Sequence, residues 1–124
     1  MIWLWVGAAG GLGAVLRFLV DSLLTTRVSE RFAPPFPVGS LTVNLTGSLL
    51  AGVMAAGATR GWSGEEVRMI VAGGFLGAYT TFSTAVYEAV RHLDRGERAS
   101  AVAHLLLSMI GSVTAAALGF ALVR

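Results

Sequence analysis

The sequence contains no cysteine and no lysine, and only 13% of its 124 residues are charged. The absence of cysteine excludes a disulfide framework, a thiolate metal site and catalysis through sulfur. The nine basic residues, all arginines, and the seven acidic residues lie in short groups between apolar runs, which argues against nucleic-acid binding. What the sequence has instead is 55% hydrophobic residues and a mean hydropathy of +0.73. These values indicate a membrane protein.

Four apolar stretches are each long enough to cross a bilayer. A membrane helix needs roughly 20 predominantly apolar residues, and the stretches that qualify are about residues 2–24, 38–58, 67–90 and 99–123. The segments between them hold most of the charges and the prolines, as expected for turns in water. The first stretch lacks the basic start of a cleavable signal peptide, so we interpret it as a retained span. The sequence therefore predicts an all-α membrane protein with one four-helix domain over residues 1–124.

Arginine counts give only a weak signal for orientation. If the four spans alternate in direction, one side of the membrane holds Arg60, Arg68 and Arg124, and the other holds Arg27, Arg31, Arg91, Arg95 and Arg98. Three against five is a small excess for the positive-inside rule, so insertion in both orientations stays open. A bundle of four helices leaves little room inside, and we expect any solute pathway to be shared between subunits.

Small residues recur along the first two spans. They are Gly7, Gly10, Gly11 and Gly13 in the first span and Gly47, Ala51 and Gly52 in the second. Such residues let helix backbones approach closely in lipid. Their spacing fits helix contacts within one subunit and contacts between two subunits equally well.

Polar side chains form a stripe on the second span. Ser40, Asn44 and Ser48 recur at every fourth residue and so share one helix face. An amide is costly in lipid unless it is paired. Asn44 therefore either makes a hydrogen bond to another helix or lines a polar path, and both interpretations stay open.

A second stripe repeats the same spacing on the fourth span, at His104, Ser108 and Ser112. A serine hydroxyl in a membrane helix often bonds the carbonyl four residues earlier, which is the ordinary alternative for each serine. Two matched stripes nevertheless favour a polar path whose donors replace the hydration shell of a small anion. His104 lies near the end of the span and is either a vestibule residue or an interfacial side chain.

Few charges lie inside the spans. Arg17 and Asp21 are one helical turn apart near the end of the first span, which predicts a structural ion pair or side chains that reach the interface. An isolated central carboxylate is absent, and Glu88, toward the end of the third span, comes nearest to one. This pattern disfavours proton-driven transport.

The segment GGFLGAYTTFST, residues 73–84, is a poor helix former inside the third span. It has three glycines followed by four hydroxyl residues around Phe82, and each glycine costs about 1 kcal/mol relative to alanine. Local unwinding is tolerated in lipid only where the freed carbonyls meet protein, water or an ion, so a sodium site and a simple kink are both open. The electropositive edge of the Phe82 ring is suited to an anion, although a lone phenylalanine usually packs in a core.

Three motifs occur in order on the first three spans: GGLGAVLRF (10–18), PVGSLTVNLTGS (37–48) and GGFLGAYTTFST (73–84). With them the chain closely resembles the CrcB/Fluc family of fluoride channels, over essentially its whole length. The resemblance implies a four-helix subunit with a broken third helix that pairs as an antiparallel, dual-topology homodimer. It also implies that fluoride passes by passive electrodiffusion through two pores.

Site roles follow from the resemblance at matched positions. Asn44 resembles the pore asparagine, and Phe82 the first of two phenylalanines that face fluoride. Ser40 stands at a threonine position of the family, and His104 stands where tyrosine is common. The whole implied anion pathway is Asn44, Phe82, Ser40, Ser108, Ser112, Thr81 and His104.

The resemblance also implies a structural sodium ion at the dimer centre, held by the backbone carbonyls of Gly77 and Thr80 from both subunits. Arg17 matches the arginine of the first motif, for which we expect a structural role. One position departs from the family, because Ala85 stands where the second phenylalanine is usual. Either one wall of the path is altered, or another aromatic such as Tyr79 or Tyr87 partly replaces it.

The sequence therefore predicts a fluoride-selective channel, not an enzyme, that exports fluoride from the cytoplasm through the bacterial inner membrane. The alternative is a small multidrug-type proton-coupled transporter, which needs an acidic residue in the first helix; the candidate is Asp21. A membrane subunit without transport activity is the third class that we consider.

Overall fold

The computed structural model describes residues 1–33 and 35–123, and every regular element in these residues is helical. Long helices are α1 (Ile2–Arg27), α2 (Val38–Thr59), α5 (Phe82–Asp94) and α6 (Arg98–Val123), and short helical elements are η1 (Ser29–Arg31), α3 (Glu65–Arg68), η2 (Met69–Leu76) and α4 (Gly77–Tyr79). The element η2 is a π-helical stretch, wound more loosely than an α-helix.

Four stretches of the described chain are long and apolar enough to cross a membrane. They are Ile2–Arg31, Val38–Thr59, Glu65–Asp94 and Arg98–Val123. The third stretch combines α3, η2, α4 and α5. The prediction of an all-helical protein with four membrane-length helical segments is confirmed.

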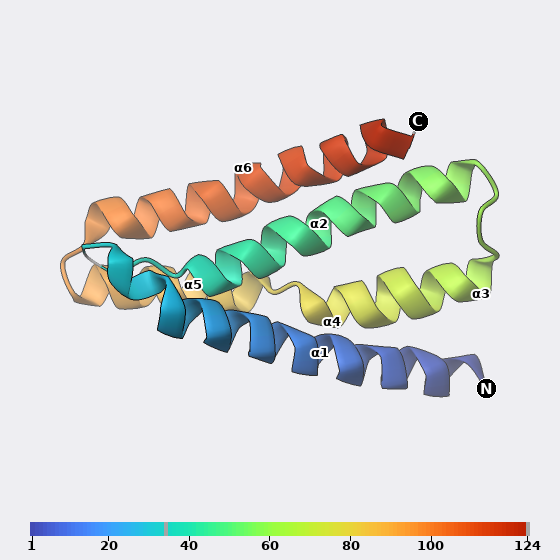
Figure 1. The fold of residues 1–124 in the computed structure, drawn as a ribbon, viewed down its shortest axis with the longest axis horizontal. Coiled ribbons are helices and arrows are strands. Elements are labelled where there is room, and N and C mark those ends of the chain that lie inside the picture. The colour runs from blue at the N-terminus through green and yellow to red at the C-terminus, as the bar shows by residue number, and fades with distance from the viewer. Residues whose placement is uncertain (34, 124) are drawn as a thin grey trace.

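The four stretches run side by side as an elongated bundle (Figure 1). The two termini and the connection from α2 to α3 lie at one end, and the connections from α1 to α2 and from α5 to α6 lie at the other. Helix α2 packs mainly against α6, whereas α1 packs mainly against η2 and also contacts α2 and α4. Large apolar side chains such as Trp3, Leu12 and Val113 remain exposed on the outside of the bundle, as expected for a surface in lipid.

Glycines bring the helices of one subunit into backbone contact. A Cβ atom at Gly52 of α2 would lie 2.0 Å from the carbonyl oxygen of Ala116, and one at Gly119 of α6 would lie 2.1 Å from that of Leu49. No side chain fits at these distances, so only glycine permits this approach of α2 and α6. Gly13 plays the same part between α1 and η2, where a Cβ atom would lie 2.3 Å from a backbone oxygen.

Other glycines of the predicted small-residue pattern face outward. A Cβ atom at Gly7 or Gly11 would meet nothing within 4 Å in the described chain. The small residues of the first span therefore divide between contacts within the subunit and an open outer surface.

Candidate functional site

Two extended residues separate α4 from α5. Helix α4 ends at Tyr79, Thr80 has φ −79° and ψ 154°, Thr81 has φ −152° and ψ 119°, and α5 begins at Phe82. The thin segment between α4 and α5 can be followed in Figure 1. The glycines and threonines of this segment have low helix propensity, so the sequence offers little local resistance to extended backbone here.

Asn44 of α2 binds the backbone of this extended segment from both sides. Its Nδ2 donates a hydrogen bond to the Thr81 carbonyl at 2.9 Å, and the Thr81 N–H donates to its Oδ1 at 2.8 Å. Asn44 therefore makes a hydrogen bond to another segment of the bundle, as one of its two interpretations predicts. The amide carries two N–H donors, so one donor remains for a second partner.

The same contacts release two carbonyl oxygens. In a continuous helix the Thr81 N–H would bond the Gly77 carbonyl, but it donates to Asn44 instead. The Thr84 N–H would likewise bond the Thr80 carbonyl, but it donates to the Thr81 hydroxyl at 3.2 Å, which caps α5. The carbonyls of Gly77 and Thr80 thus lose their usual donors four residues on.

Gly77 and Thr80 also share a small cavity of about 180 Å³, with Gly47 and Ser48 of α2 on its wall. Backbone carbonyls without helical partners are suitable ligands for a hard cation such as sodium. The carbonyl oxygens of these two residues are therefore suitable ligands for the expected sodium ion.

A second cavity, of about 220 Å³, lies beside the extended segment. Its lining residues are Asn44, Ser48, Thr80, Thr81, Phe82, Ser108, Met109 and Ser112. Five of the seven residues expected in an anion pathway thus line one pocket, contributed by α2, α5, α6 and the segment before α5. Met109 was not expected, because an apolar residue in a membrane helix gives no signal in the sequence.

The hydroxyl of Ser108 is free for another partner. Its Oγ is buried and has no hydrogen-bond partner among the residues that the structure describes. By contrast, the hydroxyls of Thr42, Thr46 and Thr114 donate to carbonyls four residues earlier, at 2.7 to 2.8 Å. The ordinary alternative, a serine bonded back to its own helix, is therefore wrong for Ser108.

Ser40 and His104 lie away from this pocket, in a second polar cluster with Glu88. Ser40 is 1% exposed and its Oγ donates a hydrogen bond to Glu88 Oε2. His104 is completely buried, and its Nε2 lies 3.2 Å from the same carboxylate oxygen. The interpretation of His104 as an interfacial side chain is therefore wrong. Glu88 was not predicted as a partner of Ser40, because 48 residues separate the two in the sequence and no periodicity connects them.

Glu88 also lines an outer cavity of about 180 Å³ at the end of the bundle where α1 connects to α2. The other lining residues are Thr25, Ser29, Pro35, Pro37, Arg91, His92 and Arg95. Glu88 thus touches the outer cavity on one side and His104 on the other. Ser108, one helical turn after His104, lines the cavity of about 220 Å³ around Asn44 and Phe82, which we call the inner pocket.

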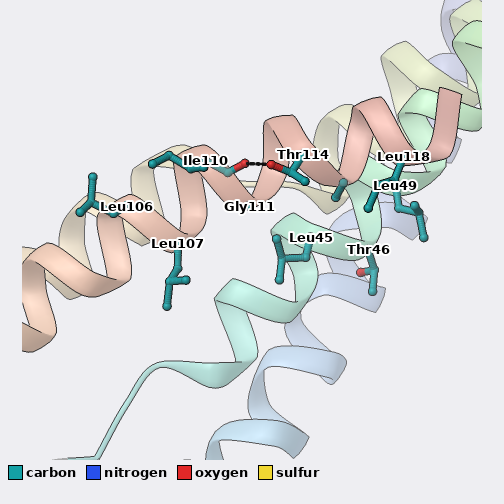
Figure 2. Close-up of a pocket in the computed structure, with 10 residues that line it drawn as sticks. Leu45, Thr46, Leu49, Leu106, Leu107, Ile110, Gly111, Thr114 and Leu118 are labelled. Carbon is teal, nitrogen blue, oxygen red and sulfur yellow. Dashed lines mark hydrogen bonds between the residues drawn. The ribbon is translucent and has the colours of Figure 1, made fainter. Parts of the chain in front are cut away.

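A larger cavity of about 550 Å³ between α2 and α6 has a different character (Figure 2). Leu45 and Leu49 of α2 and several leucines of α6 line it. Its two threonines, Thr46 and Thr114, donate their hydroxyls to their own helices. We therefore place the candidate site in the smaller polar pocket.

The prediction of an ion pair between Arg17 and Asp21 is wrong. No ion pair within 4.0 Å joins them in the described part of the chain. Asp21 Oδ1 instead accepts a hydrogen bond from Thr25 Oγ1 at 3.3 Å, and Asp21 packs so tightly on α2 that a Cβ atom at Gly39 would lie 2.1 Å from this oxygen. The Asp21 carboxylate is thus directed toward α2.

Among the residues that the structure describes, Phe82 is the aromatic side chain that lines the polar pocket around Asn44. Ala85 is completely buried. Tyr79 stacks on Phe75, with ring centroids 6.0 Å apart, and hydrogen-bonds the Thr46 hydroxyl at 3.0 Å. Tyr87 is 62% exposed beside Arg91. Neither tyrosine lines the polar pocket around Asn44 in the single subunit.

Comparison with known proteins identifies the family of this chain. The family model described as CrcB-like protein, Camphor Resistance (CrcB), matches residues 4–120. The chain belongs to the CrcB family. The resemblance stated from the three motifs is confirmed.

Relatives cover nearly the whole chain. "Fluoride-specific ion channel FluC 2" of Cutibacterium acnes is 44% identical over 98% of this chain and 97% of its own length. "Fluoride-specific ion channel FluC 1" of Symbiobacterium thermophilum is 41% identical with the same coverage. "Fluoride-specific ion channel FluC 2" of Mycobacterium bovis is 42% identical over 95% of this chain and 87% of its own length.

Proposed function

We propose that this protein is a channel through which fluoride leaves the bacterial cytoplasm across the inner membrane by passive electrodiffusion. The observation that carries the proposal is the inner pocket, which is lined by Asn44 with its second N–H, by the ring of Phe82 and by Ser108, whose hydroxyl has no hydrogen-bond partner among the described residues. The names of the relatives support fluoride as the ion.

The pocket offers a small anion what it loses on leaving water. Amide and hydroxyl groups donate hydrogen bonds, and the edge of the Phe82 ring adds a positive electrostatic potential without a formal charge. The residues lining this pocket include no carboxylate. Dehydrated fluoride therefore meets donors and no fixed negative charge.

We further propose that two subunits pair antiparallel, with the third membrane helix broken at Thr80 and Thr81 where the subunits meet. Phe82 is 65% exposed on the single subunit, which leaves it available to a pathway shared with a partner. A sodium ion held by the Gly77 and Thr80 carbonyls of both subunits would offset the partial negative charges of these carbonyl oxygens. It would also link the extended segments of the two subunits.

The test is fluoride release from liposomes that contain the purified protein. A potassium ionophore removes the voltage that would otherwise stop net anion flow. We expect release of fluoride and retention of chloride; equal release of both ions would refute selectivity. Transport of a cationic drug that is driven by a pH gradient and abolished by Asp21→Asn would indicate the multidrug-type transporter instead. Absence of any flux, together with tolerance of Asn44→Ala, would indicate a subunit without transport activity.

A further inference from the structure

The cluster of Ser40, Glu88 and His104 places an ionisable pair directly beside the proposed pathway. Glu88 lines the outer cavity, and Ser108, one turn after His104, lines the inner pocket. An anion that moves between the two cavities along α6 therefore passes these side chains. Their net charge bears on how easily it passes.

His104 is poorly satisfied as a neutral side chain. It is completely buried, and neither Nδ1 nor Nε2 has a hydrogen-bond partner within the described residues. Nε2 is close enough to Glu88 Oε2 for an ion pair, at 3.2 Å, although the direction is not that of a hydrogen bond. The Phe36 ring covers the imidazole edge-on, with centroids 5.6 Å apart. Burial without hydrogen bonds is costly for a polar group, whereas an imidazolium beside a carboxylate gains a Coulomb attraction.

From this geometry we infer that His104 and Glu88 form a proton-binding site that sets the charge of the fluoride pathway, so that conduction rises as pH falls. The inference rests on the proposed channel function. With His104 neutral, the pair carries the single negative charge of Glu88 and repels an anion. With His104 protonated, the pair is neutral and the repulsion disappears.

Other charged groups around the pair set its background. From α1, Asp21 lies against Gly39, next to Ser40. From α2, the Ser40 hydroxyl donates a hydrogen bond to Glu88. The charged or titratable neighbours on the outer cavity are Arg91 and His92 of α5 and Arg95, which directly follows α5. His92 has its own partner, Glu97, 2.5 Å from its Nδ1. Among these groups, His104 is the one that is buried against Glu88 and lies one helical turn from Ser108.

The two histidines of the chain make a direct test practical. The variant His92→Gln leaves His104 as the sole histidine once any purification tag is removed. Fluoride release is measured at equal pH inside and outside the liposomes, from about pH 5.5 to 8, where histidine changes charge. Protein-free liposomes at each pH give the leak of hydrogen fluoride through lipid, which is subtracted.

We expect flux through wild type and His92→Gln to rise about tenfold as pH falls across this range, the order expected for removing one nearby charge. Flux through His104→Tyr and His104→Gln should be independent of pH. Glu88→Gln should conduct at the high level at every pH, because its pair is never negative.

Equal wild-type flux at both ends of the range would overturn the inference, as would a rise that persists in His104→Gln or disappears in His92→Gln. Should the His104 variants fail to fold, the ring signals of His104 in His92→Gln, followed by NMR, decide: an imidazole that keeps one charge state from about pH 5.5 to 8 overturns the inference. Absence of fluoride flux at every pH would refute the channel itself, and the inference with it.

Discussion

Helix α2 makes two contacts that differ in kind. Toward α6 it uses Gly52, whose missing side chain lets backbones touch. Toward the extended segment before α5 it uses Asn44, which makes two hydrogen bonds to the Thr81 backbone. The first contact is fixed by shape and leaves nothing over. The second is fixed by hydrogen bonds and leaves one N–H of Asn44 and the carbonyls of Gly77 and Thr80 for other partners. Asn44 and Gly52 lie about two turns apart along α2, so one helix makes a contact fixed by hydrogen bonds at one level and a contact fixed by shape at another.

The largest effect is expected from Asn44→Asp. A carboxylate can still accept from the Thr81 N–H, but it cannot donate to the Thr81 carbonyl and it adds a negative charge to an anion path. We expect fluoride flux in liposomes to fall by about 100-fold, since a buried group left unpaired costs roughly 1–3 kcal/mol and more when charged. Unchanged flux would remove Asn44 from the pathway and leave it only a structural role.

Gly77→Leu sharpens the proposal for the extended segment. A bulky side chain beside the released carbonyls should prevent close approach of a second subunit, and we expect the variant to lose most of the dimer in size-exclusion chromatography with light scattering. Gly73→Leu is the control, because a Cβ atom at Gly73 meets nothing within 4 Å. A fully dimeric, active Gly77→Leu protein would argue against a cation shared at this residue.

Gly52→Ala tests the contact fixed by shape. The added methyl group would collide with the Ala116 carbonyl, and overpacking of this kind costs about 1–3 kcal/mol. We expect a lower midpoint of thermal unfolding in detergent. Gly7→Ala makes the same chemical change where the space is open, so it should be neutral or stabilising by up to about 1 kcal/mol. Equal midpoints for the two variants would contradict the packing described between α2 and α6.

The smallest effect is expected from Ser108→Ala. Loss of one uncharged donor should reduce fluoride flux by about three- to tenfold, the value of one hydrogen bond. Thr114→Val on the same helix removes a hydroxyl that bonds the Ile110 carbonyl and should leave flux unchanged. A matched loss in both variants would mean that the effect arises from the helix and not from the pathway.

Much of this fold was predictable because hydropathy over about 20 residues is a strong signal. The four helical segments and the all-helical class followed from it, and the motifs gave the family. Partners across helices were harder. The stripe of Ser40 and Asn44 was visible, but its two residues bind different targets, Glu88 and the Thr81 backbone.

The errors have a common physical cause. Arg17 and Asp21 are neighbours on α1, and local spacing favoured a pair, but Asp21 is directed toward α2. His104 lies near the end of its span in sequence, yet Phe36 and Glu88 bury it. In each case a contact between segments distant in sequence outweighed the nearest neighbour, and single-sequence periodicity does not contain such contacts.

The two hydrogen bonds between Asn44 and the Thr81 backbone have a consequence for protein design. The residue that holds the extended conformation lies 37 positions away from it, on another helix. The glycine- and threonine-rich segment therefore does not determine its own conformation. In another helical bundle without a matching amide it would keep its low helix propensity, but nothing would fix which carbonyls lose their hydrogen bonds. A transplant of this site must carry the opposing turn of α2 together with the segment it holds.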